Sequence, residues 1–114
     1  MAKLELISSA QVNLLNEWLD LKSALEGSSS NTLLAYKRDL IDFFSFLTLH
    51  NGSKNGVSQL ETINQASMRS WMAENRRSGK TSRSIARQLS SVKSFYKWFA
   101  KRRGIDPTMV LITK

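Results

Sequence analysis

Residues 82–101 read SRSIARQLSSVKSFYKWFAK, the clearest helical pattern in the chain. Its large apolar residues recur at intervals of three and four, the period of an amphipathic α-helix with one buried face. The residues predicted to face the core are Ile85, Leu89, Val92, Phe95, Tyr96 and Phe99. We predict a helix from Ser82 to about Lys101, capped by Thr81 or Ser82 and closed by Arg102-Arg103-Gly104. Trp98 lies off this stripe, so we expect it to pack against another helix, either the first or the last.

The opposite face of this predicted helix is a ladder of cations and small hydroxyls. It consists of Arg83, Arg87, Ser90, Ser94, Lys97 and Lys101. Arginine and lysine neutralise phosphates or reach base edges, and serines donate hydrogen bonds to phosphate oxygens. A helix of about 20 residues spans roughly 30 Å, which is more than enough to cross a major groove about 12 Å wide. A solvated surface is the alternative interpretation, but exposed helix faces usually mix both signs of charge, and this face has no glutamate.

The positive charge of the whole chain is concentrated around this helix. The 114 residues include 17 Lys and Arg against 9 Asp and Glu, a net charge of +8. Between Glu74 and Asp106 there is no acidic residue, and all of the excess charge lies there. The ten basic residues of this gap are Arg76, Arg77, Lys80, Arg83, Arg87, Lys93, Lys97, Lys101, Arg102 and Arg103. A block this one-sided repels itself, so we expect a polyanionic partner, with nucleic acid as the first candidate.

The composition excludes several other classes of function. The chain has no cysteine and a single histidine, His50, so neither a disulfide framework nor a thiolate or histidine metal cluster can form. His50 precedes Asn51-Gly52 and is predicted to be a helix-end residue. No apolar run approaches the roughly 18 residues of a membrane span, and the N-terminus lacks a signal-peptide pattern. We expect a single cytoplasmic domain with no metal, no cofactor and no membrane partner.

Two further helices are predicted in the first half of the chain. The first runs from a cap at Ser8 or Ser9 to about Glu26, with an apolar arc wide enough to suggest contacts on two sides. This arc contains Val12, Leu14, Leu15, Trp18, Leu19, Leu21 and Leu25. The second runs from about Asn31 to Leu49, capped by the serines after Gly27. Its predicted core stripe is Leu33, Tyr36, Leu40, Phe43, Phe44 and Leu47, with Asn31, Thr32, Ala35, Arg38, Asp39 and Asp42 outside it.

The remaining segments are a loop, a third helix and a short terminal helix. Residues 51–58 hold two glycines without periodicity and are predicted to be a mobile surface loop around Lys54. The third helix begins after Asn64 and stops with Gly79 in the C′ position, carrying Met68, Trp71 and Met72 inward. Its last-turn residues Arg76 and Arg77 suit the negative end of the helix dipole. The dipeptide at 106–107, Asp-Pro, is predicted to start a final short helix that runs through Met109 and Leu111.

Two phrases of the sequence resemble a known family. Residues 31–40, NTLLAYKRDL, resemble the second helix of the N-terminal core-binding domain of tyrosine recombinases. Residues 84–99, SIARQLSSVKSFYKWF, resemble the fourth helix of that domain in the Xer and phage-integrase branch. Their order and the Asp106-Pro107 that follows extend the resemblance over nearly the whole chain. Lys93 departs from the usual arginine, which keeps a phosphate contact but loses a bidentate one, and the tail at 112–114 lacks an expected Pro-Lys.

The resemblance implies an all-α fold, a SAM-like core-binding helical bundle of four main helices plus a short C-terminal helix. Such a domain, here residues 1–114, forms half of a clamp around double-stranded DNA. The C-terminal catalytic domain, with its tyrosine nucleophile, is expected to lie outside this chain, so no catalytic residue is assigned. Other recombinase subunits are expected partners in the synaptic complex. Chromosome dimer resolution and DNA integration both remain open as roles of the parent recombinase.

The predicted DNA-binding residues combine the charge pattern with the resemblance. They are Thr32, Tyr36, Arg38, Lys80, Arg83, Arg87, Ser90, Lys93, Ser94, Lys97 and Lys101. Within binding proteins, the alternative is a helical DNA-binding regulator that uses the basic helix as its recognition helix. In a different class, the chain is a helical adaptor whose basic face meets an acidic protein or an anionic membrane surface.

Overall fold

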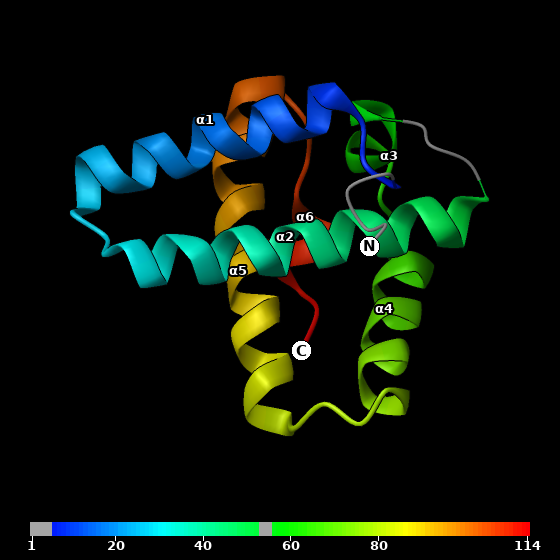
Figure 1. The fold of residues 1–114 in the computed structure, drawn as a ribbon. Helices are drawn as coiled ribbons and strands as arrows, with labels where there is room; N and C mark the ends of the chain where they lie inside the picture. The colour runs from blue at the N-terminus through cyan, green and yellow to red at the C-terminus, as the bar shows by residue number, and fades with distance from the viewer. Residues whose placement is uncertain (1–5, 53–55) are drawn as a thin grey trace. The chain divides into compact units, whose positions relative to one another are not determined.

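The computed structural model describes residues 6–52 and 56–114, and this part of the chain forms six helices and no strand (Figure 1). The helices are α1 (Ser9–Glu26), α2 (Ser30–Asn51), α3 (Val57–Glu61), α4 (Gln65–Arg77), α5 (Ser82–Arg103) and α6 (Thr108–Leu111). The chain divides into an N-terminal unit, residues 1–60, and a C-terminal unit, residues 61–114. The all-α prediction is confirmed, and the four main helices and the short C-terminal helix all lie within three residues of their predicted bounds.

In the N-terminal unit, α1 and α2 pack against each other as an antiparallel hairpin (Figure 1). Ser8 caps α1 in a capping box: its hydroxyl accepts from the Gln11 backbone N–H, and the Gln11 side chain accepts from the Ser8 N–H. Gly27, at φ 62°, ends α1 in a left-handed conformation that favours glycine. Ser29 then caps α2. The hairpin is therefore closed by the Gly-Ser-Ser-Ser run that the sequence singles out.

The core stripe of α2 is confirmed, with one correction. Leu40, Phe43, Phe44 and Leu47 are buried, and Leu33 and Tyr36 are half-buried. Asp39, predicted to lie outside the stripe, is instead 1% exposed. The prediction was wrong because it weighed the polarity of the side chain above its position, one helical turn from Phe43 on the flank of the buried face.

The apolar arc of α1 is buried over only part of its length. Leu14, Leu15, Trp18 and Leu19 are buried. Leu21 and Leu25, which belong to the predicted arc, are 38% and 75% exposed, so the expected contacts on two sides do not extend to the last turns of α1. Among the described residues of this unit, the start of α2 is the helix beside the last turns of α1, and it covers one side of α1 (Figure 1).

The short helix α3 was not predicted; its first two residues had been assigned to the loop at 51–58. Five residues are too few to show a hydrophobic period. Tertiary contacts hold the helix: Leu60 is fully buried, and Gln59 Nε2 donates to Thr48 Oγ1 over 3.1 Å. Thr48 Oγ1 in turn donates to the carbonyl of Leu6 over 2.6 Å. Asn51 proves to be the last residue of α2, and the centre of the predicted loop, including Lys54, falls outside the described residues.

In the C-terminal unit, α4 and α5 run antiparallel and both pack against α6 (Figure 1). Asn64 caps α4, and its buried residues include Met68, Trp71 and Met72, as predicted. After Ser78, Gly79 adopts φ 85°. The Gly79 N–H bonds to the Arg76 carbonyl, and the Lys80 N–H bonds to the Asn75 carbonyl. These two bonds form a Schellman motif, which confirms Gly79 at C′.

The core of α5 is aromatic. All six residues of the predicted stripe are buried, and Gly104 ends the helix at φ 69°. The ring of Phe95 stacks on Phe99 at 5.4 Å and meets Tyr96 edge-on at 5.8 Å. Burial raises the pKa of the Tyr96 phenol far above its ordinary value, so this tyrosine stays neutral. Trp98 is half-buried, and its ring centre lies 5.8 Å from that of Phe95 on the same helix. Its predicted packing on the first or last helix stays a prediction.

We expect Phe95→Ala to lower the free energy of unfolding by about 3–5 kcal/mol, because Phe95 is fully buried and its removal leaves a cavity among aromatic rings. Chemical denaturation monitored by circular dichroism measures this loss. Lys97→Ala, at an exposed position of the same helix, is the control and should stay within about 0.5 kcal/mol of the parent. A Phe95→Ala protein as stable as the parent would contradict the assignment of the core.

Candidate nucleic-acid interface

The outer face of α5 carries the cation and hydroxyl ladder that the spacing predicts. Arg83, Arg87, Ser90, Lys97 and Lys101 are exposed, and Ser94 is half-buried. At 3.6 residues per turn, the six side chains fall within an arc of roughly 80° and extend over about 27 Å of the helix axis. We call this set the α5 ridge. Lys93, also predicted to bind DNA, lies at its border and is half-buried.

Several other cations of the basic stretch are engaged inside the C-terminal unit. Arg77 Nη2 lies 2.6 Å from Glu74 Oε1. Arg103 Nε lies 2.7 Å from Glu61 Oε2. The Arg102 guanidinium lies 5.8 Å from the centre of the Trp98 ring, a cation–π distance. Three charges at the two ends of the basic stretch therefore have intramolecular partners.

Three charges of the α5 ridge differ from these. Among residues 6–52 and 56–114, the side chains of Arg83, Lys97 and Lys101 make no hydrogen bond or ion pair. An exposed cation without an internal partner keeps its full field for an external anion. Ser90 and Ser94 sit between the cations and add small donors, which allow the helix backbone to approach a ligand closely. The α5 ridge is therefore a convex, positively charged surface that is one helix wide.

Lys80 has a structural position that the sequence did not suggest. Its Nζ donates to Asn75 Oδ1 and to Gln88 Oε1, each over 3.0 Å. Both amide side chains are 3% exposed, and they come from the last turns of α4 and the second turn of α5. Lys80 therefore fastens the α4–α5 turn with two of its three ammonium donors. Its predicted contact with DNA stays a prediction.

The three candidate residues on α2 do not share one face. Thr32 and Tyr36 are one turn apart, whereas Arg38 lies roughly 200° around the helix from Tyr36. The Thr32 hydroxyl lies 3.0 Å from the Ser29 hydroxyl at the helix cap. The Tyr36 ring packs 5.4 Å from the Trp18 ring. Lys22 Nζ lies 5.7 Å from the Tyr36 ring, so this tyrosine is part of the α1–α2 packing, whereas Arg38 is exposed.

The described residues carry few other chemical features. In this part of the chain no group of three His, Cys, Asp or Glu side chains could hold a metal ion. No described helix is both long enough and apolar enough to cross a lipid bilayer. His50 is in the last turn of α2, as predicted, with its ring stacked 5.4 Å from that of Phe46.

The family described as phage integrase, N-terminal SAM-like domain, matches residues 15–104. Curated relatives named tyrosine recombinase XerC include that of Rickettsia typhi, 34% identical over 88 residues, which are 77% of this chain and 29% of the relative. The XerC of Brucella suis is 35% identical over 86 residues, 75% of this chain and 27% of the relative. The chain thus spans roughly three tenths of the length of these relatives. No solved structure matches it significantly.

Lys80→Met should lower the free energy of unfolding by about 1–3 kcal/mol, because the buried amide oxygens of Asn75 and Gln88 each lose a donor. Thermal and chemical denaturation would measure the change. Lys101→Met, which removes the same charge at an exposed site, is the matched control and should have little effect. Equal stability of both variants would show that Lys80 does not fasten the turn.

Proposed function

Because the chain belongs to the family of phage integrase N-terminal SAM-like domains, we propose that it is the DNA-binding core domain of a Xer-like tyrosine recombinase. In this proposal the α5 ridge meets the duplex, with Arg83, Arg87, Lys97 and Lys101 neutralising phosphates. Ser90 and Ser94 donate to the backbone between them. Lys80, Lys93 and the α2 residues Thr32, Tyr36 and Arg38 are proposed as further contacts.

The observation that carries the proposal is the separation of charge within the C-terminal unit. The neighbouring Arg77 and Arg103 are paired with Glu74 and Glu61, whereas the α5 ridge has no acidic residue. Folding gives no reason to place four cations in a row on one helix face, because like charges repel each other. A duplex provides the matching polyanion, with one negative charge per roughly 1.7 Å of helix axis.

The chain is proposed to bind rather than to catalyse. The relatives named tyrosine recombinase XerC are about three times as long, and strand exchange in a protein that contains this domain would depend on residues beyond residue 114. We propose a cytoplasmic parent recombinase that acts with other recombinase subunits in chromosome dimer resolution or DNA integration.

Among the candidate contacts on α2, Arg38 faces away from Tyr36. Arg38 would therefore contact the DNA backbone independently of Tyr36.

Arg83→Gln and Lys97→Gln should each weaken duplex binding several-fold without lowering the melting temperature, because each removes an exposed cation that has no partner in the described part of the chain. Fluorescence anisotropy with a labelled duplex measures the affinity. Arg77→Gln is the matched control, since it removes an equal charge that is already paired with Glu74, and it should change binding less. Unchanged affinity in both ridge variants would remove the ridge from the interface.

Duplex binding by the chain should also depend strongly on salt. If three or four ridge cations contact phosphates, the slope of log K against log[salt] should be about −3 to −4. In Lys97→Gln the slope should become shallower by about one. Titrations between 50 and 200 mM salt, about the range in which counterion release is usually resolved, give this number. A slope near zero would contradict phosphate contacts of any kind.

A further inference from the structure

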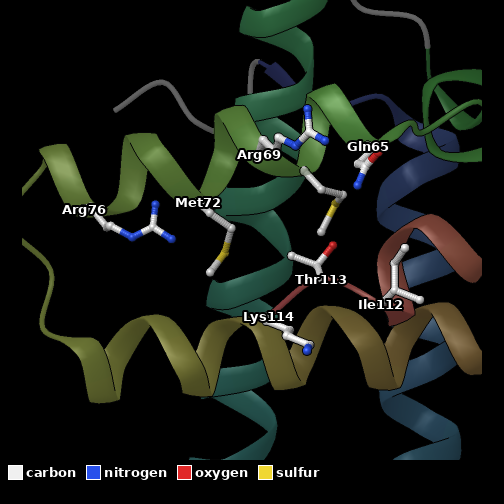
Figure 2. A pocket seen from close by; sticks show the side chains of 8 residues that line it. Gln65, Arg69, Met72, Arg76, Ile112, Thr113 and Lys114 are labelled. Carbon is white, nitrogen blue, oxygen red and sulfur yellow. The ribbon is translucent and has the colours of Figure 1, made fainter.

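The C-terminal unit has a second basic surface, on α4, that the proposed DNA contact does not use. A hollow of about 400 Å³ lies between α4 and the last residues of the chain (Figure 2). Arg69, Met72 and Arg76 line it from α4, and Ile112 and Lys114 line it from the C-terminal segment. Arg69 lies outside the basic stretch that begins at Arg76, so the charge pattern of the sequence did not point to this site.

The hollow combines an apolar floor with a basic rim. Met68 and Met72 are 1% and 6% exposed and form the floor together with Ile112, which is 52% exposed. Three cations lie around it, Arg69, Arg76 and Lys114, and all three are exposed. No Asp or Glu belongs to its lining among the described residues. Thioether side chains adapt to different apolar partners, so methionines suit a floor that receives a side chain from outside.

The rim cations have no internal partner in the described part of the chain. The side chains of Arg69, Arg76 and Lys114 make no hydrogen bond or ion pair there. Arg77, the neighbour of Arg76, is by contrast paired with Glu74. The positive field around the hollow is therefore directed outward, at the edge of an apolar surface.

The spacing of the rim indicates the form of the ligand. Arg69 and Arg76 are seven residues apart on α4, which separates them by about 10.5 Å along the axis, with Met72 between them. In an extended peptide, alternate side chains point to the same face, and about 3.3 Å per residue places residues i and i+4 about 13 Å apart, which two long arginine side chains can span. An apolar side chain at i+2, on the same face of the peptide, would lie over Met72. Lys114, on the opposite side, can receive a further carboxylate.

The apolar floor distinguishes a peptide from a nucleic acid. A sugar-phosphate backbone has no apolar side chain to bury on Met68 and Met72, and the α5 ridge shows the convex arrangement of cations and hydroxyls that suits phosphates. A protein interface typically has an apolar centre inside a polar rim, and this hollow is organised in that way. Charge complementarity then requires an acidic partner.

We propose that this hollow docks an acidic peptide segment of a partner protein, with two carboxylates on Arg69 and Arg76 and one large apolar side chain on the methionine floor. The proposal does not depend on DNA binding, because it uses a different helix and different cations.

The test uses a fluorescein-labelled synthetic peptide that contains Glu-Ser-Leu-Ser-Glu, titrated with the whole chain at low salt and followed by anisotropy. Saturable binding is expected. It should be weakened about tenfold when both glutamates become glutamines, and weakened again when the leucine becomes serine. The double variant Arg69→Gln/Arg76→Gln should bind the parent peptide about tenfold more weakly than the unaltered chain.

A charge-matched variant separates this site from the proposed DNA surface. Arg83→Gln/Lys97→Gln removes two charges from the same unit on α5, and it should leave peptide affinity nearly unchanged while weakening duplex binding. The α4 double variant should show the opposite pattern. Melting temperatures equal to that of the parent would establish that both variants are folded.

Four results would overturn the proposal. The first is the absence of saturable peptide binding, and the second is equal loss of peptide affinity in the α4 and α5 double variants, which would indicate only non-specific attraction. The third is a loss of duplex affinity in the α4 variant as large as in the α5 variant, which would assign Arg69 and Arg76 to DNA. The fourth is self-association of the parent chain in sedimentation velocity that the α4 variant abolishes, which would assign the hollow to a second copy. Loss of duplex binding in the α5 variant alone bears only on the proposed DNA contact.

Discussion

The one-sided burial of α5 is the constraint on which the rest of the C-terminal unit depends. Val92, Phe95, Tyr96 and Phe99 have no exposed surface, and the rings of the three aromatic residues pack in stacked and edge-on contacts. Because an α-helix repeats every 3.6 residues, fixing one face of α5 inward leaves the residues of the opposite face in water. The cations of the α5 ridge are therefore held in a row by the aromatic core beneath them, and their side chains need no contact with each other to be aligned.

The cations of the C-terminal unit have different roles, depending on whether they have partners within the protein. Glu74 and Glu61 hold Arg77 and Arg103 close to the ends of α4 and α5, and two buried amides hold Lys80 at the turn. These cations contribute to the fold. Among the described residues, neither the ridge on α5 nor the lining of the hollow on α4 includes an acidic residue, yet the ridge is convex and carries hydroxyls whereas the hollow is recessed and apolar. The α5 ridge and the hollow on α4 are thus both positively charged, but they suit partners of different chemistry.

Local hydrogen bonds determine where the helices begin and end, and long-range ones hold the short segments in place. Serine, threonine or asparagine caps open α1, α2, α4 and α5, and left-handed glycines follow three of these helices directly and α4 after Ser78. Such signals act over three to five residues, so they can be read in the sequence. Two hydrogen bonds, from Gln59 to Thr48 and from Thr48 to the Leu6 carbonyl, link residues that are more than 40 positions apart in the sequence.

The class of the fold, the bounds of its main helices and the charged face of α5 could all be predicted from the sequence. Each of these follows from local rules, namely helix period, capping residues and the absence of acids between Glu74 and Asp106. Tertiary packing was needed to reveal the burial of Asp39, the exposure of Leu25, the short helix α3, the role of Lys80 at the turn and the hollow lined by both Arg69 and Lys114. These features depend on which distant segment covers a residue, and hydrophobic periodicity within one helix has no information about its neighbours.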